Sequence, residues 1–492
     1  MPIAADKKST GNIRLLVCGL LIVLLGASVA QGQPAPRQAS SCQYGPWTAI
    51  DTTALRREAG LFKNPRLTPS PDRLYLTANP VPHPSNLGAP EVVGGKVAWA
   101  YGLDHSLWAG TLPGLNPIPH PPGDFTFDEP VGAIGPDGAL HLAWTEPHPD
   151  SLTAAQKDTA FNHLAPRRVY HARYIDETWS EPELVYQSRH ESEPLITLQW
   201  GPGSPAFEVG PTGEAHLLFG LRGTGKIIYL RRSEGSWQAD TLGKGLHRAV
   251  ATGSGGRLAY AYSQRDFPDP RHEYGIVRLW VARSTDGGET WTRTTVLDSS
   301  EQVATGQIGS VRYAKLVGTP DDTLHIVWGR RRPKRDPDEP CCSLSEGLGV
   351  KALWHARSTD GGRTWQVSDP VSLPEDNKLH ALRVAKDKCG QVHALANLEV
   401  TRSENGAGQH LLQYTRWRED EGWADLRSVA PPSSSQTHEV GPLRTAAFAA
   451  WRGRLWLVWN QEVQNGTQAP RAVLRRIRPL RTRRTQESSG QK

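Results

Sequence analysis

The 492-residue sequence has a single methionine, only eight phenylalanines and five cysteines. Beyond residue 30 it has no apolar run long enough to span a membrane. It is rich in glycine (48), proline (39) and tryptophan (17), a composition typical of turn-rich β structure and not of helical bundles. A chain of this length can hold several domains, but a repeat fold uses the whole length as one body.

The N-terminus has the pattern of an export signal. The basic residues Lys7, Lys8 and Arg14 are followed by the apolar run 15–30, whose last residues are small and fit cleavage after Ala30. At 16 residues this run is shorter than the roughly 20 that a spanning helix needs, and an uncleaved anchor is the alternative. We predict a signal peptide over 1–30 and a secreted, periplasmic or cell-envelope protein with no membrane span after cleavage.

Cleavage at that site leaves four cysteines. An even number in an exported chain predicts disulfides, with three possible connectivities among Cys42, Cys341, Cys342 and Cys389. The adjacent Cys341 and Cys342 are expected to bond different partners, for example one each of Cys42 and Cys389. None of the spacings matches a zinc site, and we predict no metal and no cofactor.

The net charge of +6 belongs to the two ends of the chain. Residues 1–30 carry +2 and residues 475–492 carry +6, so the body between them is slightly acidic. A basic pI of this origin is poor evidence for nucleic-acid binding, and no nucleic-acid partner is predicted. Residues 31–41 are predicted to be a polar leader, and residues 481–492 a basic, disordered tail.

Two near-identical stretches organise the body of the chain. Residues 279–291 and 353–365 each consist of an apolar strand, an Asp-Gly-Gly turn and a second strand that opens on Trp. Asp-Gly is a strong hairpin signal because glycine reaches positive φ without steric cost. The Asp carboxylate is expected to accept backbone N–H groups of the turn, and the Ser and Thr hydroxyls add to that network.

The shared pattern Ser-x-Asp-x-Gly-x-Thr-Trp resembles the Asp-box, or BNR repeat, of the sialidase-like β-propeller superfamily. The matching residues are Ser284, Asp286, Gly288, Thr290 and Trp291, and Ser358, Asp360, Gly362, Thr364 and Trp365. In families that use the Asp-box it lies on outer hairpins, away from the catalytic face. The resemblance therefore implies that Asp286 and Asp360 brace turns and take no part in catalysis.

Weaker copies of a two-strand unit recur along the chain. The first strand of a unit often reads apolar-His-apolar-apolar-Trp, and the second usually ends in Arg before a turn and a Trp. We count seven units, whose first strands begin at Val97, Leu140, Ala215, Leu258, Leu324, Val392 and Leu455. The repeated histidines are interpreted as packing residues, because equivalent positions in different blades are held apart: His141, His216, His325 and His393.

The predicted fold is an all-β propeller of about seven four-stranded blades, with six blades as the alternative. It forms a single domain over residues 42–480, and we expect a monomer. The last unit lacks its own Trp-led outer strand. The N-terminal stretch 44–50 is expected to supply that strand and to close the ring.

The long connections are predicted to gather at one face, which we call the rim. If the Asp-Gly-Gly turns join third to fourth strands at one face, the second-to-third connections lie at the other. Those connections are the long ones, and long loops on a rigid scaffold are where binding sites are usually built: 145–168, 263–275, 329–349 and 397–409.

Polar residues leave the strands at the predicted rim. We predict that Glu146, Asp266 and Glu399 are catalytic, and that the ligand-binding residues are Asp104, Arg265, Arg330, Arg331 and Glu462. Arginines suit a ligand carboxylate, and two carboxylates suit the acid and the base or nucleophile of glycoside hydrolysis. The segment 330–342 is interpreted either as a disulfide-pinned arginine clamp over the mouth or as a surface flap.

The resemblance to sialidases is incomplete at their catalytic residues. The early Arg motif finds its nearest match at Arg66, where a Thr is inserted before the proline, and no tyrosine follows Tyr414 to act as the late nucleophile. Two functions therefore stay open: an exported glycoside hydrolase of sialidase type, and a non-catalytic propeller that binds glycan or protein at the cell envelope. A pair of rim carboxylates roughly 5–10 Å apart would favour the hydrolase.

Overall fold

The computed structural model describes strands and turns between residues 43 and 480. The chain divides into Met1–Ser40, all outside the description, and a compact unit over Ser41–Lys492. The predicted signal peptide, leader and tail thus lie outside the described residues. Described are residues 43–44, 48–49, 61–69, 74–81, 99–102, 116–117, 128–147, 167–176, 178–188, 206–221, 226–252, 257–265, 276–298, 311–318, 322–331, 350–374, 377–387, 389–401, 408–429, 433–434, 446–451, 454–461, 471–477 and 479–480.

The strands pair in antiparallel order, mostly with their neighbours in sequence. Sheet 1 is β3 (Leu61–Pro69), β4 (Leu74–Val81), β5 (Trp99–Gly102) and β6 (Asn116–Pro117). Sheet 2 is β7 (Asp128–Ile134), β8 (Leu140–Pro147), β9 (Arg167–Ile175) and β10 (Thr178–Trp179), with β11 (Glu183–Gln187) also on β9. Sheet 3 is β12 (Ala206–Val209), β13 (Ala215–Gly220), β14 (Lys226–Ser233) and β15 (Ser236–Lys244).

The later sheets repeat this plan. Sheet 4 is β16 (Leu246–Thr252), β17 (Leu258–Arg265), β18 (Ile276–Ser284) and β19 (Thr292–Asp298). Sheet 5 is β20 (Val311–Gly318), β21 (Leu324–Arg331), β22 (Val350–Ser358) and β23 (Gln366–Ser372). Sheet 6 is β24 (Asn377–Lys386), β25 (Val392–Thr401), β26 (Gly408–Arg418) and β27 (Gly422–Trp423), with β28 (Arg427–Ser428) and β29 (Ser433–Ser434) also on β26. Sheet 7 is β30 (Ala447–Trp451), β31 (Arg454–Gln461), β32 (Arg471–Ile477) and β2 (Thr48–Ala49), and β1 (Gln43–Tyr44) pairs with β33 (Pro479–Leu480).

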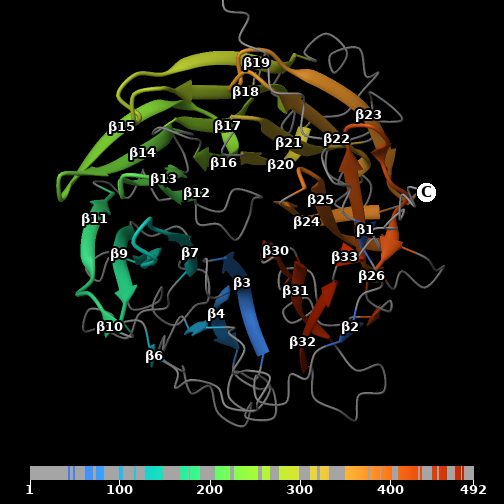
Figure 1. Cartoon of the computed structure of the whole chain (residues 1–492), viewed down its shortest axis with the longest axis horizontal. Coiled ribbons are helices and arrows are strands. Elements are labelled where there is room, and N and C mark those ends of the chain that lie inside the picture. Colours follow the sequence, from blue (N-terminus) through green and yellow to red (C-terminus); the bar gives the residue numbers. More distant parts are fainter. Residues whose placement is uncertain are drawn as a thin grey trace, which may run out of the picture. The chain divides into compact units, whose positions relative to one another are not determined.

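The first strands of the sheets lie innermost, as Figure 1 shows for β3, β7, β12, β16, β20, β24 and β30. Each contacts the first strand of the next sheet along the chain, and β30 contacts β3. Within the described residues the chain is therefore all-β, built from several four-stranded antiparallel sheets, an architecture consistent with a propeller. No helix among these residues is long and apolar enough to cross a membrane.

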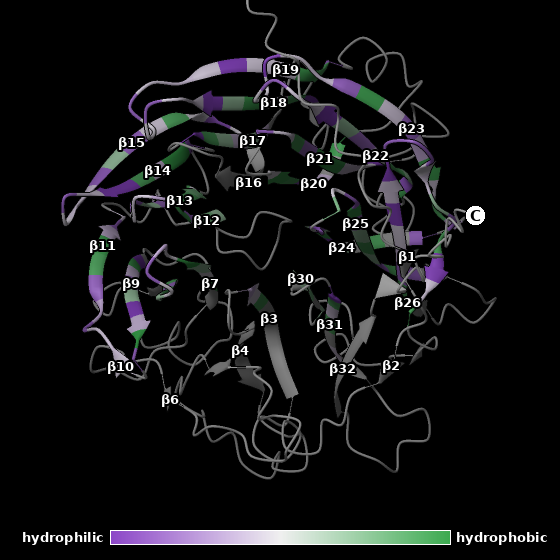
Figure 2. Cartoon of the chain, in the orientation of Figure 1, coloured by the Kyte–Doolittle hydropathy of each residue, from purple (hydrophilic) through white to green (hydrophobic). Residues whose placement is uncertain are grey.

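Apolar side chains fill the seams between neighbouring sheets. Ile326 and Trp328 of sheet 5, for example, are fully buried in one cluster with Val281 of sheet 4. Burying a side chain of this size stabilises a fold by about 1.5–3 kcal/mol. The outer strands are more polar: β13 is buried along its whole length, whereas β15 is mostly exposed. Figure 2 shows the same trend, with much purple and white on β15, β19 and β23.

The N-terminal stretch pairs with the end of the chain. In β2, Thr48 is paired with Arg476 and Ala49 with Arg475, so that β2 is the fourth strand of sheet 7. This strand comes from the segment expected to complete the last unit. Its pairing ties the two ends of the described chain into one sheet.

The first unit differs from its predicted arrangement. Residues 97–100 were expected to open the unit, but Trp99–Gly102 form β5, the third strand of sheet 1, and β4 holds the second position. The prediction was wrong because β4 lacks the apolar-His-apolar-apolar-Trp pattern that marks the second strands elsewhere. Gly102 pairs with Tyr75 near the start of β4, so the chain leaves β5 at the end of the sheet opposite the predicted rim. Asp104 follows this exit and lies outside the described residues.

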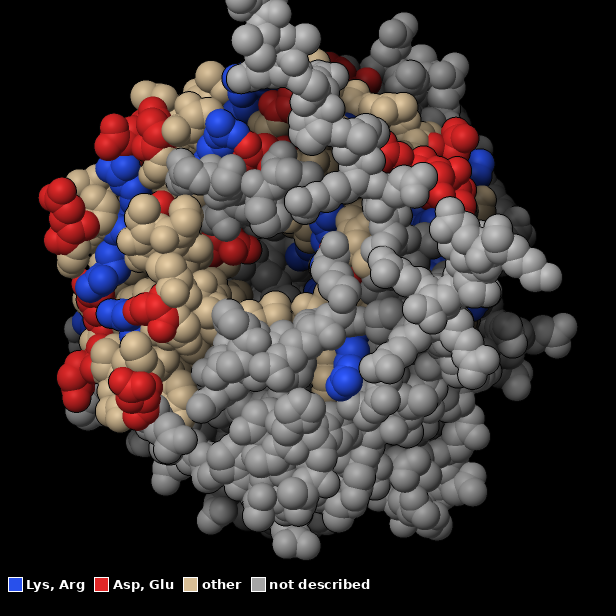
Figure 3. All heavy atoms as spheres, viewed as in Figure 1, with Lys and Arg blue, Asp and Glu red and all other residues tan. Residues whose placement is uncertain are grey.

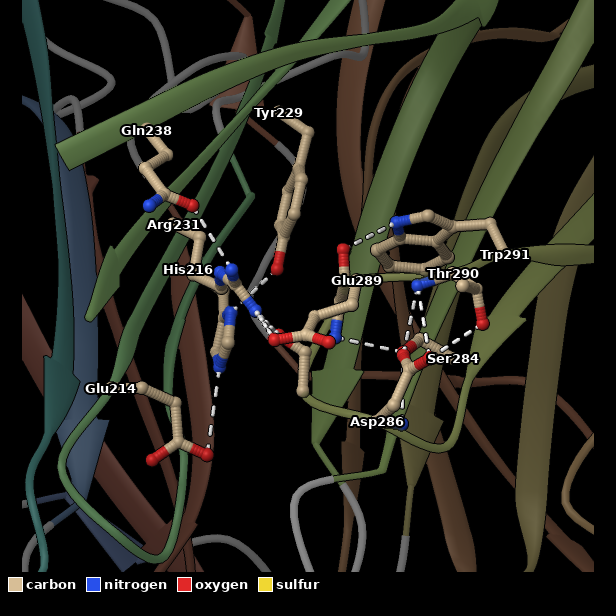
Figure 4. Close-up of polar contacts among 12 residues, drawn as sticks. Glu214, His216, Tyr229, Arg231, Gln238, Ser284, Asp286, Glu289, Thr290 and Trp291 are labelled. Carbon is tan, nitrogen blue, oxygen red and sulfur yellow. Dashed lines mark hydrogen bonds and ion pairs between the residues drawn. The ribbon is translucent and has the colours of Figure 1, made fainter.

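The two Asp-Gly-Gly turns are held by the same internal hydrogen bonds. The Ser284 hydroxyl donates to Asp286 Oδ1 (2.6 Å) and accepts the backbone N–H of Gly288 (2.8 Å). The Asp286 carboxylate accepts both the backbone N–H (2.9 Å) and the hydroxyl (2.5 Å) of Thr290. Figure 4 shows these contacts and the Trp291 indole, which donates to the Gly288 carbonyl.

The second turn repeats this geometry around Asp360, where Ser358 and Thr364 make the equivalent bonds. Hydrogen bonds from Ser284 and Thr290 lower the pKa of Asp286 to about 2. Burial acts to raise the pKa of Asp360, but hydrogen bonds from Thr364 and Ser358 outweigh it, and the pKa is also about 2. Both carboxylates are therefore fixed anions that hold a turn.

Replacing Gly288 by alanine is expected to destabilise the protein by about 2–4 kcal/mol. Gly288 has φ +90°, and a β-carbon there would collide with the Tyr229 hydroxyl of sheet 3. Gly287 is the matched control, since its φ is +66° but nothing lies within 4 Å of an added β-carbon, and Gly287→Ala should cost only about 1 kcal/mol. Urea unfolding followed by tryptophan fluorescence measures the free energy of unfolding of both variants. Equal losses of stability would contradict the role of the close contact between Gly288 and Tyr229.

Candidate ligand site at the rim

Four predicted site residues lie at the same end of their sheets. The register pairs Glu146 with Arg168, Arg265 with Ile276, Arg330 with Ala352, and Glu399 with His410. In sheets 4 and 5 this end is opposite the Asp-Gly-Gly turns, because Leu258 pairs with Ser284 and Leu324 with Ser358. The connections between β8 and β9, β17 and β18, and β21 and β22 start from this end, as predicted from the alternation of antiparallel strands. The predicted connection 397–409 was too long, because residues 397–401 belong to β25 and residues 408–409 to β26, and these two strands pair with each other.

Side-chain burial is described for two of these residues. Arg330 is buried, and Glu399 is half-buried and interacts with neighbouring groups. For Glu146, Arg265 and Arg331 only the strand position is described. Asp266 and Glu462 lie outside the described residues, as do Cys42, Cys341 and Cys342, whereas Cys389 is disulfide-bonded.

Arg330 is a buried cation at the rim end of β21. The residue is 7% exposed, and its guanidinium carbon lies 4.9 Å from the centre of the Trp354 ring. Its buried Nε has no hydrogen-bond partner, and within the described part of the chain no carboxylate forms an ion pair with it. Burial lowers the pKa of Arg330, although an arginine remains charged. Burial of a charge is costly, and the contact with the Trp354 ring offsets part of that cost.

The first strands of sheets 1, 2, 4, 5 and 6 carry β-bulges at one level next to this rim end. The inserted residues lie opposite the equivalent positions Ala78, Trp144, Tyr262 and Trp328 of the second strands, and in sheet 6 opposite Asn397 and Leu398. We call residues 64–65, 129–130, 247–248, 313–314 and 380 the bulge level. Bulges re-aim side chains and are frequent beside active sites. Reading the sequence missed this level, because only the second and third strands had a recognisable pattern.

Figure 3 shows a hollow in the middle of the face that it presents, among the first strands of Figure 1. Charged side chains of both signs border the described part of this hollow. A polar concave surface framed by rigid strands suits a polar ligand.

At the other end of the sheets, four buried histidines are paired across strands. In sheets 2 and 5 two histidine rings share a hydrogen bond: His141 with His171 (3.1 Å) and His325 with His355 (3.0 Å). In sheets 3 and 6 a tyrosine takes the second place: His216 with Tyr229 and His393 with Tyr414, each at 2.8 Å. The four repeated histidines predicted to pack are thus buried and hydrogen-bonded in pairs.

A carboxylate lies next to two of these pairs. In sheet 6, Asp387 is hydrogen-bonded to His393 (3.2 Å), which gives a carboxylate–His–Tyr chain. In sheet 3, Glu214 Oε1 lies 3.9 Å from His216 Nε2, too far for a hydrogen bond, and this nitrogen has no hydrogen-bond partner (Figure 4). Burial raises the pKa of both Tyr229 and Tyr414, so the phenols stay protonated in these pairs. Among the described residues no cluster of His, Cys, Asp or Glu could hold a metal ion.

No protein-family model matches the sequence, and no curated protein matches it. Solved structures match at low identity. An ulvan lyase of polysaccharide lyase family 25, bound to -[GlcA(1-4)Rha3S]-, is 11% identical with a TM-score of 0.48, over 88% of this chain and 93% of the lyase. A protein of unknown function from Dyadobacter fermentans is 16% identical with a TM-score of 0.41, over 74% of this chain and 97% of that one.

The sialidase of Trypanosoma rangeli, in complex with the inhibitor DANA, is 10% identical with a TM-score of 0.39, over 73% of this chain and 55% of the sialidase. The chain is thus distantly similar to sialidases and to ulvan lyase propellers. At these identities and TM-scores the likenesses carry no information about its activity.

Proposed function

We propose that residues 42–480 form one seven-bladed propeller, closed by β2, which binds and processes an acidic glycan at the rim. The contacts of each first strand with the next, and of β30 with β3, support seven blades in one ring. The pairing of β2 with β32 supports the closure. The chain is exported after cleavage at Ala30, so the secreted protein should begin at Gln31, which N-terminal sequencing tests.

Arg330 carries the proposal of an acidic ligand. Its guanidinium is desolvated, is held against Trp354 and lacks a carboxylate partner among the described residues. A planar guanidinium binds a carboxylate or sulfate group through paired N–H donors, and burial strengthens that contact. We expect the anionic group of the ligand to pair with this guanidinium.

Carboxylates at the same rim support a hydrolytic reaction. Glu146 and Glu399 lie at the rim ends of β8 and β25, and Asp266 follows the rim end of β17. In glycoside hydrolysis one carboxyl group protonates the leaving oxygen, and a second acts as base or nucleophile. A non-catalytic glycan-binding propeller is the second candidate, because a guanidinium can bind an anionic group without any catalytic carboxylate.

Replacing Arg330 by glutamine is expected to weaken binding of acidic glycans by roughly tenfold or more, since a desolvated charge-assisted contact is lost. The probes are 3′-sialyllactose, oligogalacturonate and dextran sulfate, with lactose, methyl-esterified oligogalacturonate and dextran as neutral counterparts. Calorimetry measures binding, and mass spectrometry detects released sugar.

The control variant is Arg363→Gln, which removes an exposed arginine from the turn at the opposite end of sheet 5. It should bind like the wild type. Release of sugar by the wild type supports the hydrolase, and retention without release supports the binding protein. Equal binding of acidic and neutral probes, or unchanged binding by Arg330→Gln, would overturn the acidic-ligand proposal.

A further inference from the structure

We propose that Trp354 is a second ligand-binding residue of the rim site, next to Arg330; this inference rests on the proposed function. Arg330 binds the acidic group of a saccharide, and the Trp354 indole N–H donates a hydrogen bond to a neutral oxygen of the same saccharide. The Trp354 ring also positions the guanidinium. The ligand class is therefore a saccharide that presents a carboxylate or sulfate close to a ring, bridging or hydroxyl oxygen.

The two side chains are in contact on one face of sheet 5. Arg330 pairs with Ala352 and Trp328 pairs with Trp354, so that Arg330, Trp328 and Trp354 project from the same face of β21 and β22. The guanidinium carbon of Arg330 lies 4.9 Å from the centre of the Trp354 ring. A saccharide whose acidic group binds the guanidinium is therefore within reach of the indole.

Trp354 is held in place by the core of the protein. Its ring stacks on Trp328, with 6.5 Å between the ring centroids and 18° between the planes, and Trp328 is fully buried. Both tryptophans pack in the cluster between sheets 4 and 5. The guanidinium of Arg330 thus lies against a ring that is already fixed. Such preorganisation favours binding, because less side-chain freedom is lost when the ligand binds.

The indole N–H of Trp354 is a donor that reaches solvent. Trp354 is half-buried, and within the described part of the chain its nitrogen has no hydrogen-bond partner. The indole nitrogens of Trp280 and Trp328 also lack a partner there, but both are buried, whereas the Trp354 nitrogen is not. Guanidinium and indole N–H groups only donate hydrogen bonds, so the two side chains together suit a group rich in acceptor oxygens.

The variant Trp354→Phe tests this assignment because it keeps an aromatic ring beside Arg330 and removes the N–H. We expect affinity for 3′-sialyllactose or oligogalacturonate to fall roughly threefold to tenfold. Binding of either probe should change the tryptophan emission of the wild type, and most of this change should be lost in the variant. Trp354→Leu removes the ring as well and should weaken binding further, because Arg330 then loses its cation–π contact.

The matched control is Trp280→Phe. Trp280 holds the equivalent position in sheet 4, where it pairs with Tyr262 as Trp354 pairs with Trp328, and its indole nitrogen is buried. This variant should bind both probes like the wild type and keep the emission change. Urea midpoints of the two Phe variants compare the effect of the smaller ring on stability.

The outcomes separate this inference from the proposed function. If Arg330→Gln weakens binding and Trp354→Phe stays within twofold of the wild type, the acidic-ligand site stands and the indole contact is wrong. Equal weakening by Trp354→Phe and Trp280→Phe would also overturn the contact, because the effect would then come from packing. If the wild type binds no acidic probe, the proposed function fails and the inference fails with it. Weakening by Arg330→Gln and Trp354→Phe, but not by Trp280→Phe, supports both.

Discussion

Lowering the pH from 7 to 4 is expected to unfold this protein, because its paired histidines are buried in the neutral form. Burial lowers the pKa of His141 to about 3, of His216 to about 4 and of His325 to about 2, and the partner ring adds to the effect at His141 and His325. Burial also lowers the pKa of His355 to about 3. In the unfolded chain a histidine titrates near pH 6.5.

The stability of the fold decreases as the pH falls, because a folded pKa below the unfolded one means that the unfolded chain binds the proton more tightly. The stability contributed by each histidine is complete above pH 6.5 and is lost as the pH falls from there toward the folded pKa. The loss is on the order of 1 kcal/mol per pH unit for each buried histidine. Summed over several histidines it is comparable with the whole stability of a typical domain.

Urea midpoints between pH 7.5 and 4, followed by tryptophan fluorescence, measure this loss. A double variant His325→Ala with His355→Val copies sheet 4, which has Ala259 and Val281 at the equivalent positions. It should show a shallower pH dependence, whatever its stability at pH 7. A constant midpoint from pH 7 to 5 in the wild type would contradict buried neutral pairs.

Asp286 and Asp360 affect stability at lower pH than the histidines do. Because their folded pKa values are lowered, they stabilise the fold fully above pH 3.8, and this stabilisation is lost as the pH falls below that value.

Replacing Asp387 by alanine is expected to cost about 3–5 kcal/mol of unfolding free energy, the usual range when a buried charge network loses one member. The carboxylate is buried and accepts the backbone N–H groups of Cys389 (2.8 Å) and Gln391 (2.9 Å) as well as His393 (3.2 Å). Alanine would leave these groups without their acceptor inside sheet 6.

The control for this change is Asp387→Asn. An asparagine oxygen can still accept the two backbone N–H groups, so we expect a loss of only about 1–2 kcal/mol. Urea unfolding at pH 7.5, where His393 is neutral, compares the two. Equal losses for Ala and Asn would mean that the negative charge, and not the hydrogen-bond acceptor, supports this turn.

Several features could be predicted because their interactions are local. The hydrogen bonds of the 284–291 turn span at most four residues, so the sequence Ser-Thr-Asp-Gly-Gly-Glu-Thr-Trp specifies them directly. The repeated strands were also visible, because alternation and the terminal Arg are properties of the strand itself. The order of the strands in sheet 1 could not be predicted in this way. β4 has neither the apolar-His-apolar-apolar-Trp pattern nor a terminal Arg, and its place depends on pairing with β3 and β5.

The sequence by itself determined the β class, the turns, the second and third strands of sheets 2 to 7 and the end of the sheets where the polar rim residues lie. Only the tertiary structure decided how those residues are placed. The burial of Arg330 and its contact with the Trp354 ring depend on the register between β20, β21 and β22. The pairing of His141 with His171 joins residues 30 positions apart. A one-residue shift of register moves side chains to the other face of a sheet, and no local pattern specifies that register.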